Sequence, residues 1–598
     1  MRDQKICPEE SMRKKIVPTI VALVSMTQPL YAQTLAGTQS SVGSLRKVYF
    51  GDLHLHTIYS FDAYLGGAPT TPDQAYKFAQ GHPISYEGST VKRAWPLDFL
   101  AVTDHAEDIG VVNELNDPNS SLFKSEVGQK IRNKDWSGST WLEKPTEDLR
   151  GFAAAWQKEM EAANSNYRPG AFTTFIGYEW TAEPNAQNLH RIVIFRGNTA
   201  PYPFTSYDST RPEDLWTYLE NSRKNGSDVL AMPHNANASS GLMYPWNDSD
   251  GKPIDRIYAQ RRAFNEPLSE ISQEKGQSET HPVLSSTDEF ANFELMDFLA
   301  SGAKGPREVH GSYVREAYGR GLVIASKVGV NPYKFGVEAS SDIHTGLSES
   351  DEKTSGPSEG TKNLMEKYPE YKDSLYTVGS AGVTGVWAEQ NTRESIFDAL
   401  RRKETFGTSG TRLEFRFFGG WDYALDALSR KDWVKDAYAK GVPMGGDLPA
   451  MPRAAKRPRF LVSALKDPTS GNLDRVQIIK VWLKGNGYEE SVFDVAWSGR
   501  RKPDPKTSKL PPVGNTVDVK TATYSNTIGA TKLSTVWEDP NFDAKVPAVY
   551  YLRVLEIPTP RWSTIQAVKA RLPLPVRVSA TIQERGWSSP IWYSPVRN

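Results

Sequence analysis

The stretch Gly51-Asp52-Leu53-His54-Leu55-His56-Thr57 follows a short apolar run at residues 48–50, which predicts a buried strand that ends in two histidines. On an extended backbone, side chains two positions apart point the same way, so both imidazoles can reach one metal ion. A pair of histidines at this spacing is weak support by itself, because surface and core histidines are common. The positions of the other histidines therefore decide the interpretation.

Further histidines and carboxylates stand where other predicted strands begin or end. Buried strands are predicted at residues 99–102, 172–176, 229–232 and 335–339. The polar segments beside predicted strands are Thr103-Asp104-His105, Tyr178-Glu179-Trp180, His190-Arg191, Pro233-His234-Asn235 and Asp342-Ile343-His344. Six of the nine histidines thus lie at strand ends, whereas unrelated histidines would be scattered over surface and loops. A set of His, Asp and Glu without cysteine suits a hydrolytic site for Zn²⁺, Mn²⁺ or Fe ions.

Residues 46–410 have the pattern of an α/β barrel or a doubly wound sheet, because the apolar runs are separated by stretches long enough for helices, such as 393–402. In such folds the chemistry lies at the carboxyl ends of the strands, which is where most of the polar segments fall. Two long polar stretches, 109–150 and 244–289, exceed the usual connection length and are candidate active-site lids.

Residues 411–598 have a different pattern, which predicts a β-rich, sandwich-like second domain. Short alternating runs separated by Gly, Pro and Asn occur at 459–463, 476–483, 549–555 and 576–582. No histidine follows His344, so we expect the chemistry in the first domain. The second domain would have a packing, substrate-shaping or partner-binding role.

Composition limits the partners of the chain. Lys plus Arg and Asp plus Glu number 71 each among 598 residues, so no overall basic charge favours nucleic acid or anionic lipid. No apolar stretch reaches the ~20 residues that a membrane-spanning helix needs. The sequence lacks a Gly-rich dinucleotide motif and a Gly-x-Ser-x-Gly motif, which disfavours dinucleotide redox chemistry and a serine hydrolase.

Residues 1–32 have the proportions of a cleaved bacterial signal peptide. Arg13-Lys14-Lys15 precedes an apolar run at 16–26, and small residues follow near Ala32. We therefore expect a periplasmic or secreted protein, with a buried N-terminal helix as the alternative. Cys7, the single cysteine, lies in this segment, so the mature chain would offer no disulfide, zinc–thiolate site or cysteine nucleophile.

Two levels of resemblance add to this interpretation. The ordered set of HxH, TDH, a mid-chain Glu, a later His and a final DxH resembles the PHP (polymerase and histidinol phosphatase) superfamily of metallo-phosphoesterases. The finer sequence, from about Val48 to Asn598, is similar to the exported bacterial family called domain of unknown function 3604 (DUF3604). The motifs that carry this similarity are Asn265-Glu266-Pro267, Gln273-Glu274-Lys275-Gly276, Ser278-Glu279-Thr280-His281-Pro282, Phe417-Phe418-Gly419-Gly420-Trp421, Gly441-Val442-Pro443-Met444-Gly445-Gly446 and Pro558-Thr559-Pro560-Arg561-Trp562.

The PHP resemblance implies a distorted seven-stranded (β/α) barrel that holds up to three metal ions. The ligands it implies fall in three sets: His54, His56, Glu179 and Asp342; Glu179 as a bridge, with His190 and His234; and Asp62, His105 and His344. His281 is an alternative to His190 at the second position. Asp104 would orient a ligand imidazole, or else cap the loop that follows it.

These expectations combine into a function. Two or three divalent ions (Mn, Zn or Fe) would lower the pKa of a bound water and offset charge on a phosphoryl oxygen, which suits hydrolysis of a small phosphomonoester or phosphodiester. We expect Glu179, Asp104 and Arg191 to act in catalysis. Lys275 and Arg315 are further candidate phosphate clamps, and ordinary ion pairing is the alternative for all three cations. The alternative functions are metal-dependent hydrolysis of an amide, lactone or sulfate ester, and a non-catalytic binding protein that retains metal.

Overall fold

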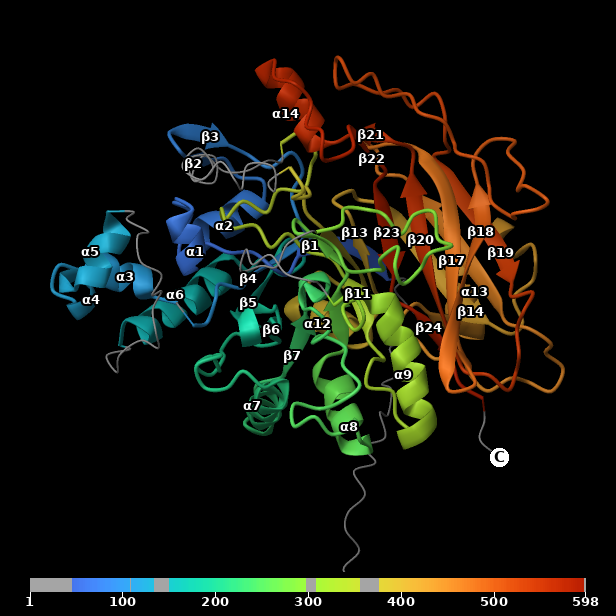
Figure 1. Cartoon of the computed structure of the whole chain (residues 1–598), viewed down its shortest axis with the longest axis horizontal. Helices are drawn as coiled ribbons and strands as arrows, with labels where there is room; N and C mark the ends of the chain where they lie inside the picture. The colour runs from blue at the N-terminus through green and yellow to red at the C-terminus, as the bar shows by residue number, and fades with distance from the viewer. Residues whose placement is uncertain (1–45, 108, 134–149, 297–307, 355–375, 596–598) are drawn as a thin grey trace, which may run out of the picture. The chain divides into compact units, whose positions relative to one another are not determined.

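A mixed β-sheet of twelve strands runs through the chain and confirms the predicted α/β class (Figure 1). The computed structural model describes residues 46–107, 109–133, 150–296, 308–354 and 376–595. In spatial order, the sheet contains β18 (Gly487–Trp497), β17 (Leu473–Lys484), β20 (Ala548–Glu556), β23 (Arg585–Ser588), β13 (Thr405–Thr408), β12 (Val383–Ala388), β1 (Lys47–Asp52), β4 (Phe99–Val102), β5 (Thr173–Trp180), β6 (Arg191–Phe195) and β7 (Val229–Pro233), and β24 (Ile591–Tyr593) pairs with β20.

Smaller sheets and helices surround the large sheet. A four-stranded sheet contains β15 (Gly441–Pro443), β14 (Glu414–Gly420), β16 (Arg459–Leu465) and β19 (Lys532–Glu538). The two-stranded sheets are β8 (Leu268–Glu270) with β11 (Gly336–Glu338), β9 (Ser272–Gln273) with β10 (Gly276–Gln277), β2 (Ile84–Tyr86) with β3 (Ser89–Val91), and β21 (Thr559–Pro560) with β22 (Thr581–Ile582). The α-helices are α1 (Phe61–Leu65), α2 (Pro72–Ala79), α3 (Val111–Asn116), α4 (Ser121–Lys124), α5 (Glu126–Arg132), α6 (Arg150–Asn166), α7 (Pro212–Lys224), α8 (Arg256–Asn265), α9 (Val314–Val328), α12 (Arg393–Arg401), α13 (Trp433–Lys440) and α14 (Trp562–Ala570).

The central strands bring their polar ends to one edge of the sheet. β1, β4 and β5 are parallel, so the residues that follow each strand emerge together. β6 is antiparallel to both β5 and β7, so β6 begins at the edge where its two neighbours end. His190, which precedes β6, and His234, which follows β7, are thereby placed beside Glu179 of β5. Beyond β1, an isolated parallel bridge joins Leu55 to Ile343.

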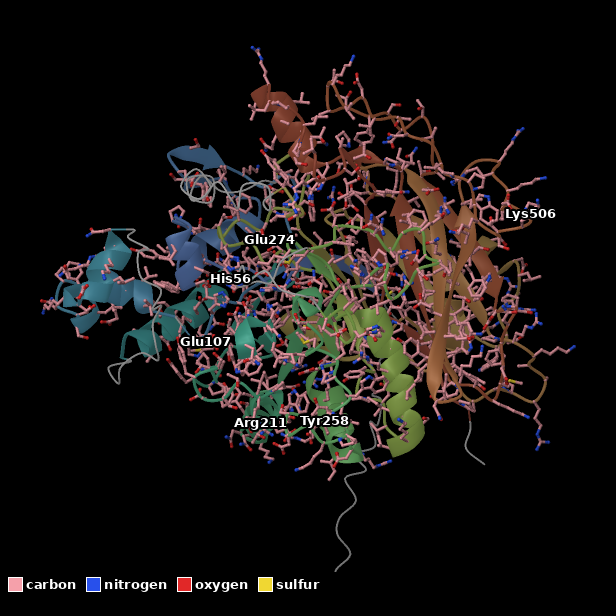
Figure 2. The ribbon with its side chains drawn as sticks, in the orientation of Figure 1. His56, Glu107, Arg211, Tyr258, Glu274 and Lys506 are labelled. Atoms are coloured by element: carbon pink, nitrogen blue, oxygen red, sulfur yellow. The ribbon has the colours of Figure 1, made fainter. Side chains whose placement is uncertain are left out.

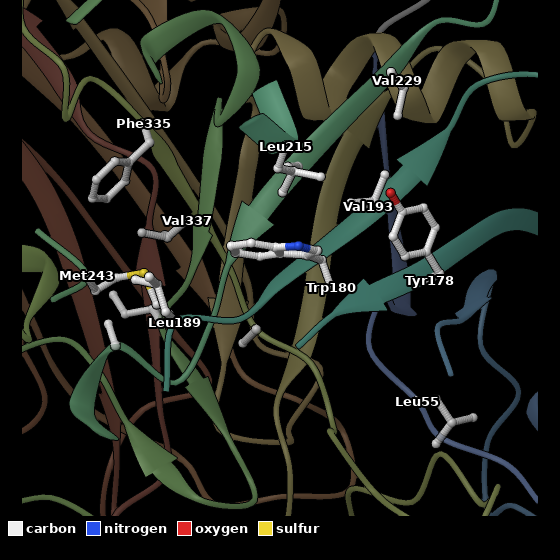
Figure 3. Packing of buried hydrophobic residues seen from close by; sticks show 14 of the residues in the cluster. Leu55, Tyr178, Trp180, Leu189, Val193, Leu215, Val229, Met243, Phe335 and Val337 are labelled. Atoms are coloured by element: carbon white, nitrogen blue, oxygen red, sulfur yellow. The ribbon is translucent and has the colours of Figure 1, made fainter. Parts of the chain in front are cut away.

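Alternate residues of the central strands point to opposite faces, and both faces are buried. In β4, Phe99 and Ala101 belong to one hydrophobic cluster, whereas Leu100 and Val102 belong to another. Figure 3 shows the second cluster, with the Trp180 indole at its centre. Burial of both faces explains why these strands are nearly continuous apolar runs in the sequence.

The C-terminal strands extend the large sheet. The connection is the pair β13–β23, in which Phe406 lies opposite Ser588. Leu45–Asn598 accordingly forms one compact unit. The expected division between 46–410 and 411–598 therefore cuts through a sheet that both stretches build. Pairing between strands so distant in sequence leaves no local pattern, which is why the sequence suggested a boundary there.

Two faces of the C-terminal strands are covered by different layers. Ile478 of β17 and Leu552 of β20 belong to a cluster shared with β14 and β16 of the four-stranded sheet. Their neighbours Ile479 and Tyr551 belong to the cluster that includes α9. Helix α9 lies against β17 and β18 (Figure 1). The alternation predicted from the sequence is therefore real, and both sets of alternate residues are buried.

Several local predictions agree with the structure and others do not. The predicted strand at 99–102 is β4, and the predicted helix at 393–402 is α12. The candidate lid at 244–289 contains α8 and strands β8 to β10 rather than an irregular loop. Of residues 576–582, only Thr581–Ile582 forms a strand, and Val576 is 97% exposed.

Some predictions fall outside the described residues. They are the signal peptide at 1–32 with Cys7, and residues 134–149 of the other candidate lid. Across the described part of the chain, no helix combines the length and apolar character that crossing a membrane requires.

Candidate metal centre

Glu179, at the end of β5, lies where the predicted histidines meet. Its Oε1 is 2.7 Å from His190 Nδ1 and 2.9 Å from His234 Nε2. The nitrogens beside its Oε2 are His56 Nε2 at 3.1 Å, His105 Nδ1 at 3.2 Å and His54 Nε2 at 3.5 Å. The Glu179 side chain is 1% exposed, and its Oε2 accepts no hydrogen bond despite these three nitrogens. The two oxygens of one buried carboxylate thus face two different sets of imidazoles.

Asp342 forms a second contact group with the histidines of the first motif. Asp342 Oδ1 is 3.2 Å from Nε2 of both His54 and His56, and those two nitrogens are 3.1 Å apart. Asp342 has a φ of 53°, and Asn235, directly after His234, has a φ of 48°. Left-handed backbone is uncommon for residues other than glycine and concentrates at functional sites. The chain therefore turns sharply where it carries Asp342 and His234 into the cluster.

Asp62 lies at the exposed rim of the same cluster. Its Oδ2 is 2.9 Å from His344 Nε2 and 3.4 Å from His105 Nε2. The Asp62 side chain is 54% exposed and that of His344 is 22% exposed, so the cluster opens to solvent on this side. Groups of three side chains with ligand atoms within 4.8 Å of one another, able to hold a divalent ion, are His56, His105 and His344; His54, Glu179 and His234; and His54, His56 and Asp342.

Hydrogen bonds behind the cluster fix which imidazole nitrogen faces it. Ser60 Oγ donates to Asp104 Oδ1 at 2.6 Å and lies 2.8 Å from His56 Nδ1. Because the single Ser60 proton is used on Asp104, His56 Nδ1–H donates to Ser60 and the unprotonated Nε2 faces the cluster. His54 Nδ1 lies 2.9 Å from Glu270 Oε2, which fixes the same tautomer. Both histidines of the first motif therefore turn Nε2 toward the cluster, and Nε2 is the atom through which each would bind a metal ion.

Asp104 itself is held by the loop after β1. Its Oδ1 accepts from Thr57 N at 2.6 Å, and its Oδ2 accepts from Thr57 Oγ1 at 2.6 Å. These bonds use the carboxylate to organise the loop and to orient His56 through Ser60. This arrangement corresponds to the orienting role expected for Asp104.

We expect Asp104→Asn to weaken metal binding by ~10–100-fold, because loss of a partner that orients a ligand imidazole typically has this effect. Asp104 accepts hydrogen bonds at both oxygens, from Thr57 N and Ser60 Oγ at Oδ1 and from Thr57 Oγ1 at Oδ2, whereas the NH2 group of an amide can only donate, so the bonds at one of the two positions would be lost. Metal affinity would be measured by competition with a chelating dye. The control is Asp255→Asn, the same chemical change at the exposed N-terminal cap of α8, which should leave metal affinity unchanged. Equal affinity in the two variants would contradict the orienting role.

The charge states of two central residues suit metal binding. Burial acts to raise the pKa of Glu179, but the nearby His105, His234 and His190 outweigh it and hold that pKa well below its ordinary value. Burial, reinforced by His54, lowers the pKa of His234 to about 3. At neutral pH the site therefore contains an ionised carboxylate and a neutral imidazole, the forms that bind metal.

The structure separates the two candidates for the second position. His190 is 6% exposed and contacts Glu179, and its Nε2 is 3.3 Å from Glu183 Oε1. His281 Nδ1 instead accepts from the backbone N of Val283 at 3.1 Å, and its ring lies 5.6 Å from Tyr313. The geometry favours His190 over His281.

Arg191 and Arg315 hold elements of the fold together. Arg191 is 0% exposed, and its Nε lies 3.1 Å from Glu266 Oε1. Arg315 is 0% exposed, and its Nη2 lies 2.8 Å from Asp288 Oδ2. Each buried guanidinium is paired with a protein carboxylate, so the geometry favours the ion-pairing alternative over a phosphate clamp for both arginines. Lys275 differs, since its Nζ contacts Asp342 Oδ2 and its side chain is 23% exposed.

Sequence reasoning missed three residues at the site: Ser60, Glu183 and Glu270. Glu270 ends the three-residue strand β8, and no histidine near it in the sequence drew attention to it. Ser60 and Glu183 lie in loops without a recognisable motif. Ser60 and Glu183 could have been found only from their position in the sequence, because each follows shortly after a segment predicted to carry ligands.

A buried cluster of histidines and carboxylates at the end of a sheet is the kind of site that can bind divalent metal ions. The chain belongs to the DUF3604 family, described as proteins of unknown function, whose profile matches residues 43–144 and 137–595. Among solved structures, the chain is similar to a two-domain protein containing a predicted PHP-like metal-dependent phosphoesterase from Bacteroides vulgatus ATCC 8482. That similarity covers 85% of this chain and 92% of the other, at 10% sequence identity and a TM-score of 0.30. No curated protein matches the chain.

Proposed function

We propose that this protein is an exported, metal-dependent phosphoesterase that uses two or three divalent ions to hydrolyse a small phosphate ester. One observation carries the proposal: the two buried oxygens of Glu179 face separate sets of imidazoles, and Oε2 accepts no hydrogen bond. A buried polar atom without a partner is costly, and a bound cation would satisfy it. The donor set of imidazoles and carboxylates suits Zn²⁺, Mn²⁺ or Fe ions.

The residues divide into three proposed positions. They are His54, His56, Glu179 and Asp342; Glu179 with His190 and His234; and Asp62, His105 and His344. When bound, such ions supply an activated water and offset negative charge on the ester oxygens. The protein's own contribution is to hold Nε2 of His54 and His56 toward the cluster through the partners of their Nδ1 atoms.

Finer features of the fold belong to the same proposal. Side chains of β4, β5, β6, β7, β8 and β12 share one hydrophobic cluster with helix α12, and this shared core supports a distorted barrel. The cluster between the four-stranded sheet and the C-terminal strands of the large sheet supports a sandwich-like packing of that half. Export would depend on cleavage of residues 1–32, so the mature N-terminus should lie near Gln33.

We expect the purified protein to carry two or three equivalents of transition metal and to lose its hydrolytic activity when a chelator removes them. Elemental analysis after extensive dialysis tests the metal content. Turnover of phosphate mono- and diesters is then compared with that of amides, lactones and sulfate esters. Less than one equivalent, with no uptake on titration, would contradict the proposal. Metal-dependent turnover of only the non-phosphate compounds would support the alternative hydrolase instead.

A further inference from the structure

The tip of the β9–β10 hairpin lies against the metal cluster. The hairpin pairs Gly276 with Gln273, so Glu274 and Lys275 form its turn. Glu274 Oε1 is 4.0 Å from His344 Nδ1, and Lys275 Nζ contacts Asp342 Oδ2. The His344 ring in turn stacks on that of His56 at 4.1 Å, and Figure 2 labels both His56 and Glu274. The motif Gln273-Glu274-Lys275-Gly276 is thus part of the site.

The hairpin is held rigidly from several sides. Gln273 Oε1 accepts from Lys275 N at 2.8 Å, and Asn237 Nδ2 donates to Lys275 O at 3.0 Å. Glu274 N donates to Ser341 O at 3.2 Å. Gly276 has a φ of 88°, and a Cβ there would lie 2.3 Å from Glu294 O, so the turn requires glycine. A rigid support fixes the position of the Lys275 ammonium before any ligand arrives.

The charges around Lys275 would change when the cluster binds metal. The two oxygens of Asp342 have different neighbours: Oδ1 faces His54 and His56, and Oδ2 contacts Lys275. A second carboxylate lies near the same ammonium, since Glu274 Oε1 is 3.7 Å from Lys275 Nζ. Divalent ions at the cluster would neutralise the Asp342 charge that holds the ammonium. Lys275 would then be a partly exposed cation beside the reacting group, without a competing strong ion pair.

We propose that Lys275 binds the anionic oxygens of the scissile group, and that the site therefore takes esters of tetrahedral oxyanions, phosphate in particular, rather than neutral amides or lactones. This inference rests on the proposed function. Among the described residues, Lys275 is the cationic side chain that forms an ion pair with a cluster carboxylate and is also partly exposed. The buried Arg191 and Arg315 lack that access to a substrate.

Binding of inorganic phosphate to the metal-loaded protein tests the proposal by calorimetry, with metal content measured on the same samples. We expect Lys275→Met and Lys275→Gln to bind phosphate ~10–100-fold more weakly, because a charge-assisted hydrogen bond is lost. Lys275→Arg should recover most of the affinity, because it restores the cation. Lys327→Met, at an exposed lysine of α9, is the matched control and should bind as the wild type does. Titration with sulfate shows whether the site binds phosphate and sulfate with different affinities.

Each outcome decides the question. Weaker phosphate binding with unchanged metal content, in either neutral variant, supports the proposal. Unchanged phosphate affinity overturns it, and so does loss of metal, since Lys275 would then only position Asp342. Tighter binding of sulfate than of phosphate would overturn the assignment of phosphate. A wild type that takes up no metal, or binds metal but no phosphate, would instead refute the proposed function on which the inference rests.

Discussion

Glu179→Gln is expected to release the bound metal ions together and to lower turnover by more than the ~100-fold that loss of an orienting partner causes. Glu179 faces His190 and His234 with one oxygen and His54, His56 and His105 with the other. A charged carboxylate between two divalent ions offsets their mutual repulsion, and a neutral amide cannot do so to the same extent. Metal content and turnover would be measured under identical metal loading.

Two histidine variants complete this comparison. His190→Ala removes the imidazole 2.7 Å from Glu179 Oε1, so we expect it to lose metal at one position and most activity. His281→Ala removes an imidazole that contacts Tyr313 and Val283 instead, so metal content and turnover should stay at the wild-type level. Retention of all ions and most activity in Glu179→Gln would contradict the bridging role of Glu179.

Arg553→Met is expected to destabilise the protein by ~3–5 kcal/mol, the usual cost of removing one partner from a buried ion pair. Arg553 Nη2 lies 2.7 Å from Asp288 Oδ1, and its Nη1 lies 3.2 Å from Glu279 Oε2. Arg315 pairs with the same two carboxylates, so the buried network contains two positive and two negative charges. Without Arg553, one negative charge remains buried and uncompensated. The free energy of unfolding would be measured by chemical denaturation.

Lys484→Met is the control for this stability experiment. Its ion pair with Glu489 is exposed, with side chains 64% and 43% accessible. Exposed pairs contribute ~0–1 kcal/mol, so this variant should unfold near the wild-type midpoint. If Arg553→Met proved as stable as the wild type, this buried ion-pair network would not be important for stability. It would then contribute little to joining α9 and the preceding segment to the C-terminal strands.

The sequence predicted those parts of the site that depend on local pattern. His54 and His56 follow a strand whose apolar run is visible over a few residues, and the same holds for His105 and His234. The contact of Glu270 with His54 joins residues 216 positions apart and depends on the position of β8, which has no distinctive local signal. Long-range register of this kind cannot be deduced from the periodicity of one strand.

The same reasoning explains why the pairing between the two stretches was not predicted. The alternating runs after residue 410 correctly indicated strands, but the partner of a strand is not encoded in its own alternation. β23 pairs with β13, which comes from the stretch assigned to the first domain. Likewise, the buried Arg191 and Arg315 cannot be distinguished by sequence from exposed cations, because their carboxylate partners Glu266 and Asp288 are distant along the chain.

The pairing of β13 with β23 has a consequence for how the protein can be divided. A chain shortened at residue 410 would leave β13 as an open edge, with backbone N–H and C=O groups no longer bonded to β23. Such an edge is a template for pairing with other molecules, so the shortened chain should aggregate. The residues that surround the metal centre and the C-terminal strands would therefore have to be inherited, and to fold, as one piece.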